Sequence, residues 1–106
     1  MPKYLFRATY TADGAKGLIS EGGSGRVEVA ARLADRLGGK LESYYFAFGE
    51  DDVVGILDLP DNVSMAAVNL TVGATGLVNT KTTALLTPEE VDAAARKSVS
   101  YRGPGK

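Results

Sequence analysis

The sequence predicts a small α+β domain in which an antiparallel sheet of four strands carries helices on one face. Three observations lead to this fold class. Four short stretches have the residue composition of β-strands, two stretches between them have apolar residues at helical spacing, and together they follow the order β-α-β-β-α-β. The length of 106 residues suits one domain. We place that domain at residues 1–99 and expect residues 100–106 to form a disordered tail.

The first strand is expected from Tyr4 to Tyr10, an aromatic and aliphatic run that is too short for an isolated helix. A helical stretch should follow from about Thr11 to Glu21 and break at the glycine-rich segment 22–25. A second helix should then run to the glycine pair 38–39. Its buried face is expected to carry Val27, Ala30, Leu33, Ala34 and Leu37, and its outer face Arg26, Glu28, Arg32, Asp35 and Arg36.

A β-hairpin is expected next, with strands from Lys40 to Phe48 and from Val53 to Leu59 joined by the acidic turn 49–52. The first of these strands is the most aromatic part of the chain, and both of its faces are expected to be covered. Alternation of side chains places Leu41, Tyr45 and Ala47 on one face, and Tyr44, Phe46 and Phe48 on the other.

The second half of the chain begins with Pro60, which ends a strand because proline cannot donate to a sheet. Asp61 or Asn62 is expected to cap the helix that follows. Residues 77–85 alternate as in a strand, and the segment 87–98 opens with a capping-box pattern and should form a short helix. The inner face of the helix after Pro60 is expected to carry Val63, Ala66, Ala67 and Leu70.

Right-handed crossovers between these elements favour the ferredoxin-like split βαβ arrangement, with a short extra helix at the C-terminus. Helices on one face leave the other face of the sheet open. If that face were solvated, every second residue of a strand would be polar. Val54 and Ile56 on one face are instead as apolar as Val53 and Leu57 on the other. We therefore expect a homodimer that packs through the open sheet face. The alternative is a tight monomer whose C-terminal helix folds over that face.

Composition excludes several classes of function. Lys and Arg number 12 against 13 Asp and Glu, so the chain lacks the surplus positive charge that binding to nucleic acid or a membrane surface needs. It has no Cys and no His, which removes thiolate nucleophiles, the usual proton shuttle and the commonest metal and haem ligands. We accordingly expect no metal and no cofactor. Without a signal peptide or an apolar run of about 20 residues, the protein is expected in the cytoplasm.

Several local features occur together over roughly residues 2–93. They are Tyr4, Tyr10-Thr11, the helix from Ala30-Ala31 to Gly38-Gly39, Tyr45, the turn from Gly49 to Asp52 with the following Val53-Val54-Gly55-Ile56, Pro60-Asp61, Gly76 and the strand from Val78 to Thr82. In this layout the chain resembles the GYD domain family, small bacterial proteins named for a Gly-x-Tyr-Asp stretch. The resemblance implies a ferredoxin-like fold of the dimeric α+β barrel type and a dimer, but no settled biochemical activity. Asp51 stands where the family has its Tyr, so any role of that Tyr is lost or moved.

Four polar strand residues are candidate ligand-binding residues: Arg7, Tyr45, Asp58 and Lys81. If Phe6 faces the helices, alternation turns Arg7 to the open side, and similar reasoning places Lys81 there. Tyr45 and Asp58 would join them in a cavity between sheet and partner. Such a group suits a small apolar, phenolic or anionic molecule, with Arg7 pairing with a carboxylate and Tyr45 or Lys81 donating. Alternatively, Arg7 and Asp58 form a buried ion pair or face solvent at the rim.

Two further segments have both a functional interpretation, as an ion-binding site, and a purely structural one. Glu50, Asp51 and Asp52 place three carboxylates in one turn, which could attract a hard cation, but the turn lacks the long loop of spaced ligands found in calcium sites. Segment 22–25 resembles an anion-binding nest at a helix N-terminus, but no phosphate-binding Lys-Ser/Thr pair follows it. We expect a solvated turn and a flexible break between helices.

Three functions fit these expectations. The first is a homodimeric protein that binds a small molecule or a partner protein. An alternative is a cofactor-free enzyme, resembling a monooxygenase or an isomerase, that acts on a small aromatic substrate in the barrel cavity. A second alternative is a purely structural assembly module. Single replacement of Arg7, Tyr45 or Lys81 discriminates between them, because an enzyme loses turnover while a structural module loses only stability or assembly.

Overall fold

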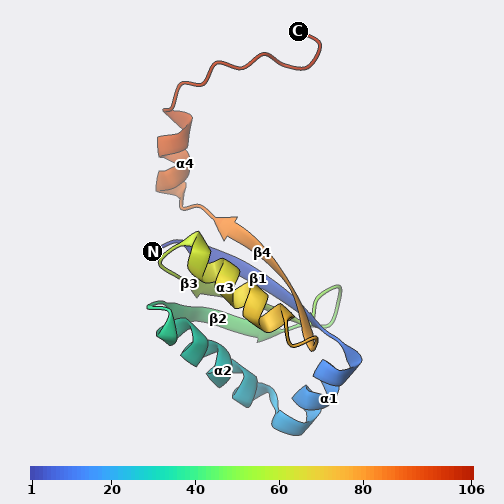
Figure 1. Ribbon diagram of the computed structural model, residues 1–106. Helices are drawn as coiled ribbons and strands as arrows, with labels where there is room; N and C mark the ends of the chain where they lie inside the picture. Colours follow the sequence, from blue (N-terminus) through green and yellow to red (C-terminus); the bar gives the residue numbers. More distant parts are fainter.

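The computed structural model describes all 106 residues and contains four strands and four helices. Along the chain they are β1 (Lys3–Tyr10), α1 (Ala12–Glu21), α2 (Gly23–Arg36), β2 (Lys40–Phe46), β3 (Val53–Asp58), α3 (Asn62–Gly73), β4 (Val78–Leu85) and α4 (Pro88–Ala95). The strands form one sheet in the order β2-β3-β1-β4, and every neighbouring pair is antiparallel. Helices α2 and α3 lie on one face of this sheet (Figure 1). The predicted ferredoxin-like fold is confirmed.

Most helix ends lie where local signals predict them. The side chains of Thr11 and Asp61 accept hydrogen bonds from the first turns of α1 and α3, and Thr87 forms the predicted capping box of α4. Helix α2 ends before Gly38, which has a φ of +78°. The glycine break before α2 is shorter than predicted, because Gly22 alone, with a φ of +87°, separates α1 from α2.

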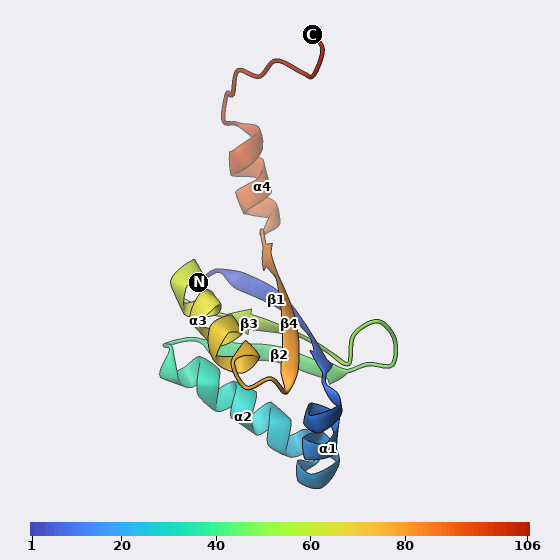
Figure 2. The ribbon, with the colours of Figure 1, turned by 45° about the vertical axis from the view of Figure 1, so that its right-hand side comes forward.

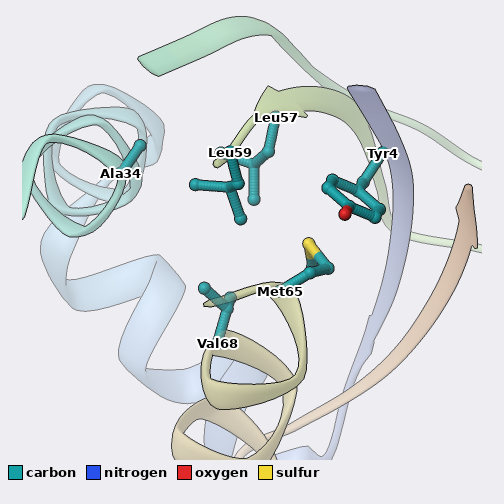
Figure 3. Close-up of a cluster of buried hydrophobic side chains, with 6 residues drawn as sticks. All are labelled: Tyr4, Ala34, Leu57, Leu59, Met65 and Val68. Carbon is teal, nitrogen blue, oxygen red and sulfur yellow. The ribbon is translucent and has the colours of Figure 1, made fainter. Parts of the chain in front are cut away.

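The core lies between the helices and the face of the sheet that they cover. It contains six buried side chains that converge from β1, α2, α3 and the end of β3 (Figure 3). They are Tyr4, Ala34, Leu57, Leu59, Met65 and Val68. Tyr4 buries its ring in this cluster and donates its hydroxyl to Asn62 Oδ1 at 2.6 Å, which satisfies its polar end. Removing these apolar side chains from water is the main force that holds the helices against the sheet.

The inner face of α3 differs from the predicted one. All four residues expected there are exposed: Val63, Ala66, Ala67 and Leu70. Met65 and Val68 are buried instead. The helix is apolar around most of its circumference, so apolar spacing fits more than one face, and the packing of α3 on the sheet decides which face is buried.

Strand β2 is shorter and less regular than predicted. Its pairing with β3 shifts register between Leu41 and Ser43, and this irregularity reverses the alternation of side chains. Leu41 therefore packs against the core on the helix-covered face, opposite to Tyr45, although the sequence predicts one face for both. The strand also ends before Phe48, whose side chain is fully exposed.

Helix α4 projects from the end of β4 and away from the sheet (Figures 1 and 2). It ends earlier than predicted, at Ala95, and none of its residues is buried. The chain is elongated as a result, with a radius of gyration of 16.9 Å where a compact chain of this length has about 13 Å. The alternative in which α4 covers the open sheet face is therefore not the arrangement found. No helix is both long enough and apolar enough to cross a membrane.

Candidate functional site on the open sheet face

The strand registers align three of the four candidate residues on one level of the sheet. Tyr45 of β2 is opposite Val54 of β3. Arg7 of β1 is opposite Val54 on one side and Lys81 of β4 on the other. Directly opposed residues of antiparallel strands point to the same side, and Phe6, next to Arg7, faces the helices. These four residues, Tyr45, Val54, Arg7 and Lys81, therefore form a row on the open face, here called the open-face row.

Asp58 lies on the same face but away from the open-face row. It is opposite Lys3 of β1, four residues and about 13 Å along the strand from Arg7. Its carboxylate accepts hydrogen bonds from Lys3 Nζ at 3.1 and 3.2 Å, and the residue is buried. The predicted alternative of an Arg7–Asp58 ion pair is wrong, because Lys3 is the partner. Lys3 also pairs with Glu42. The pKa of Lys3 is raised, mainly by its hydrogen bond to Glu42 and to a lesser extent by its hydrogen bond to Asp58.

Asp51 reaches the open-face row from the loop between β2 and β3. Its carboxylate oxygens lie 3.8 Å from Arg7 Nε and 3.4 Å from Lys81 Nζ. Opposed cations on paired strands repel each other, and a carboxylate between them offsets the repulsion. The expectation of a solvated turn is wrong for Asp51, whose side chain is 17% exposed. The available sequence signal is the presence of two cations, Arg7 and Lys81, on the face expected to be open, because a nearby anion stabilises such a pair.

Asp52 has a different role at the base of the same loop. Its carboxylate accepts a hydrogen bond from the Tyr10 N–H at 2.8 Å. Its own N–H donates to the Ala8 carbonyl, and its carbonyl accepts from the Ala47 N–H, both at 2.8 Å. The bonds with Tyr10 and Ala8 fasten the loop to β1, and the bond with Ala47 closes the base of the loop. The carboxylates of the turn thus point to different partners, and no cluster of three or more metal-ligating side chains forms.

The open-face row keeps hydrogen-bond donors for an anionic group. Asp51 neutralises one of the two cations, and its 3.8 Å contact with Arg7 is longer than a hydrogen bond. The Arg7 guanidinium therefore retains its planar set of N–H donors, which suits a carboxylate. Lys81 and Tyr45 are exposed on either side and can also donate. The arrangement can therefore bind an anion on the surface of the sheet.

The chain is similar to known proteins in sequence and in structure. The family model for the GYD domain matches residues 4–95. A crystal structure of NE2512, a protein of unknown function from Nitrosomonas europaea, has 19% sequence identity and a TM-score of 0.40, with 81% of this chain and 90% of that chain covered. No curated protein matches the chain. Because the family model spans nearly the whole folded domain, the chain belongs to the GYD domain family.

Proposed function

We propose that this GYD domain protein is a cytoplasmic homodimer that joins its subunits through the open sheet face and holds a small anionic molecule at the open-face row. The observation that carries the proposal is the composition of this face. Half-buried aliphatic residues, Leu5, Val54 and Ile56, lie there beside Arg7 and Lys81, and α4 leaves the face uncovered.

The aliphatic residues support the dimer. A sheet with helices on only one side keeps the apolar side chains of its other side in contact with water unless a second layer covers them. A second copy provides such a layer, since a two-fold axis brings the same surface onto itself. Part of the charge on this face is already compensated for burial, because the Asp51 carboxylate lies between the cations of Arg7 and Lys81.

The polar residues support the ligand. Two cations and one carboxylate leave one positive charge on the open-face row of each subunit. Burying that charge in a dimer requires an anion, and a small carboxylate would supply it with the geometry that Arg7 prefers. Tyr45, on the other side of Val54, provides a hydroxyl donor and an aromatic ring for the apolar part of such a molecule.

Native mass spectrometry of the freshly purified protein tests both parts, since it reports stoichiometry and retained ligand together. We expect a dimer that carries an extra small mass, and Arg7→Gln should lose that mass. A bare dimer would refute the ligand and favour the assembly module, while a bare monomer at micromolar concentration would refute the proposal as a whole.

A pair of substitutions locates the interface. Val54→Lys puts a charge at the centre of the open face and should convert the dimer to a folded monomer. Val63→Lys makes the same change on the outer side of α3, where the side chain is 79% exposed, and should leave the dimer intact. Size-exclusion chromatography with light scattering measures both, and circular dichroism checks folding. Dissociation by Val63→Lys alone would move the interface to the helices.

A further inference from the structure

A separate cavity lies on the helix-covered side of the sheet. Its inner part has a volume of about 110 Å³, lies between α2, α3 and the sheet, and is mainly apolar. Its lining includes Phe6, Val29, Leu33 and Val68. Helix α2 packs over β2 and α3 packs over β4, the two edge strands. The helices therefore leave a cavity over the middle of the sheet. Helices in closer contact would fill this space with side chains.

An outer cavity of about 370 Å³ adjoins the inner one, toward α1. Tyr10, Arg26 and Val72 line both cavities, so the two are neighbouring compartments of one helix-side site. The outer compartment adds charged residues, Glu21 and Arg36. An apolar interior with a few polar groups at one end is the usual distribution in a pocket for a small molecule.

Arg26 lies where the two compartments meet. The helical pattern of α2 predicts it on the solvated outer face, but the structure turns it toward the cavity. Its Nε is the buried side-chain nitrogen or oxygen atom that has no hydrogen-bond partner in this structure. Glu21 lies 3.6 Å from Arg26 Nη1, which is too long for a hydrogen bond and involves a different nitrogen. A buried donor without an acceptor is unfavourable, so the Nε–H of Arg26 is available to an acceptor that enters the cavity.

The other polar groups of the inner cavity do not supply that acceptor. No acidic side chain lines it. The Asn69 side-chain oxygen already accepts hydrogen bonds from the hydroxyls of Thr80 and Thr82. The pKa of the Tyr44 hydroxyl is raised above its usual value of 10, mainly by burial and then by a hydrogen bond with Tyr10, so Tyr44 is a neutral hydroxyl and not a phenolate.

We propose that the helix-side site binds a small amphiphilic carboxylate, with its apolar body in the inner cavity and its carboxylate accepting the N–H of Arg26 Nε. The size follows from the volume, since a protein cavity of about 150 Å³ accommodates benzene and 110 Å³ limits the apolar body to one ring or a short chain. Arg26 and Arg36 outnumber Glu21 in the outer compartment, so its net charge is positive and attracts the anion. This site belongs to a single subunit and does not depend on the dimer.

Titration calorimetry of the full-length protein with phenylacetate tests the proposal, and phenylacetamide is the uncharged probe of the same shape. We expect saturable binding of phenylacetate and at least tenfold weaker binding of phenylacetamide. Arg26→Gln should weaken phenylacetate at least tenfold, whereas Arg32→Gln, an exposed position of the same helix, should not change it. Ala30→Leu fills the inner cavity and should abolish binding of both probes at the helix-side site, and Ala67→Leu on the exposed side of α3 is its control.

Methyl resonances of Met65 and Val68, which line the inner cavity, should shift with phenylacetate in the unmodified protein, and this observation does not depend on how any variant folds. Absence of saturable binding, or full affinity in Arg26→Gln, would overturn the proposal. Loss of binding in Arg7→Gln but not in Arg26→Gln would also overturn it, because the carboxylate would then lie on the open-face row. The proportion of dimer is measured in parallel, and it tests the dimer proposal separately from the proposal for the helix-side site.

Discussion

At the scale of the residue, the absence of a side chain at Gly55 lets aromatic rings pack across the middle of the sheet. A Cβ atom at this position would lie 2.4 Å from the Phe6 ring and 2.4 Å from the Ser43 carbonyl oxygen. Phe6 in turn contacts Tyr44, with ring centroids 5.8 Å apart. Both rings line the inner cavity, so Gly55 helps to shape the helix-side site as well as the sheet.

Gly55→Ala should therefore destabilise the protein by about 1–3 kcal/mol, since both the ring and the neighbouring strand must move. Gly17→Ala is the matched control, because a Cβ atom there meets nothing within 4 Å. Helix propensity predicts a gain of up to about 1 kcal/mol at that position in α1. Urea denaturation measures both, and equal effects of the two substitutions would contradict the steric explanation.

Asp51 is the second residue whose surroundings make a specific prediction. Asp51→Asn removes the carboxylate between Arg7 and Lys81 and should lower stability by no more than about 1 kcal/mol, because both cations are partly exposed. The difference should shrink at high salt, as screening weakens the repulsion between the cations. Glu50→Gln, in the same turn, should have no such effect. If the two variants behave alike at low and high salt, Asp51 is not the counterion of the row.

At the scale of the element, the parts of the fold that could be predicted are those whose signals lie within their own sequence. The caps at Thr11, Asp61 and Thr87 involve residues three positions away, and the regular alternation of β1 and β4 places Arg7 and Lys81 on the open face. The parts that could not be predicted depend on distant contacts. The buried face of α3 is chosen by the sheet, and the irregularity in β2 exists only in its pairing with β3.

The candidate site divides in the same way. Sequence reasoning places Arg7, Tyr45 and Lys81 on the open face. Arg7 and Lys81 lie in strands that pair with each other without a register shift, and Tyr45 lies after the shift in β2. Sequence reasoning misses Asp51 because the path of a loop is not periodic. It places Arg26 on the outside of α2, because periodicity gives the angle between residues and not the rotation of the helix on the sheet.

The cap of α3 makes a prediction about pH. Hydrogen bonds from Ser64, the backbone N–H first, lower the pKa of Asp61 below its ordinary value of 3.8. The folded state therefore favours the charged carboxylate, and this contribution is complete above pH 3.8 and is lost as the pH falls through the lowered pKa. Asp61→Asn keeps a capping oxygen but should lack this acid-dependent part, and Asp61→Ala should be less stable than both at neutral pH. Thermal unfolding between pH 2 and 7 measures the difference, and identical acid profiles for the native protein and Asp61→Asn would contradict this account.

At the scale of the whole molecule, the chain is a two-layer domain with one open face and one projecting helix. The buried core contains no residue of α4. Removal of residues 87–106 should therefore shift the Tm of the domain by less than about 4 °C, which corresponds to less than 1 kcal/mol for a domain of this size. Removal of residues 98–106 alone is the control. A large loss at every protein concentration would show that α4 supports the fold, whereas a loss that grows on dilution would show that it supports the dimer.

The hydrogen bonds of Asp52 link the end of a strand to the opening of a loop. Strand ends normally fray, yet at Tyr10 the N–H is held by the Asp52 carboxylate, while the Asp52 N–H is held by Ala8. Two hydrogen bonds therefore link the end of β1 to the base of the loop. Exchange of the Tyr10 amide hydrogen with solvent requires its bond to Asp52 to break, so one backbone amide reports how often the base of the loop that carries Asp51 opens.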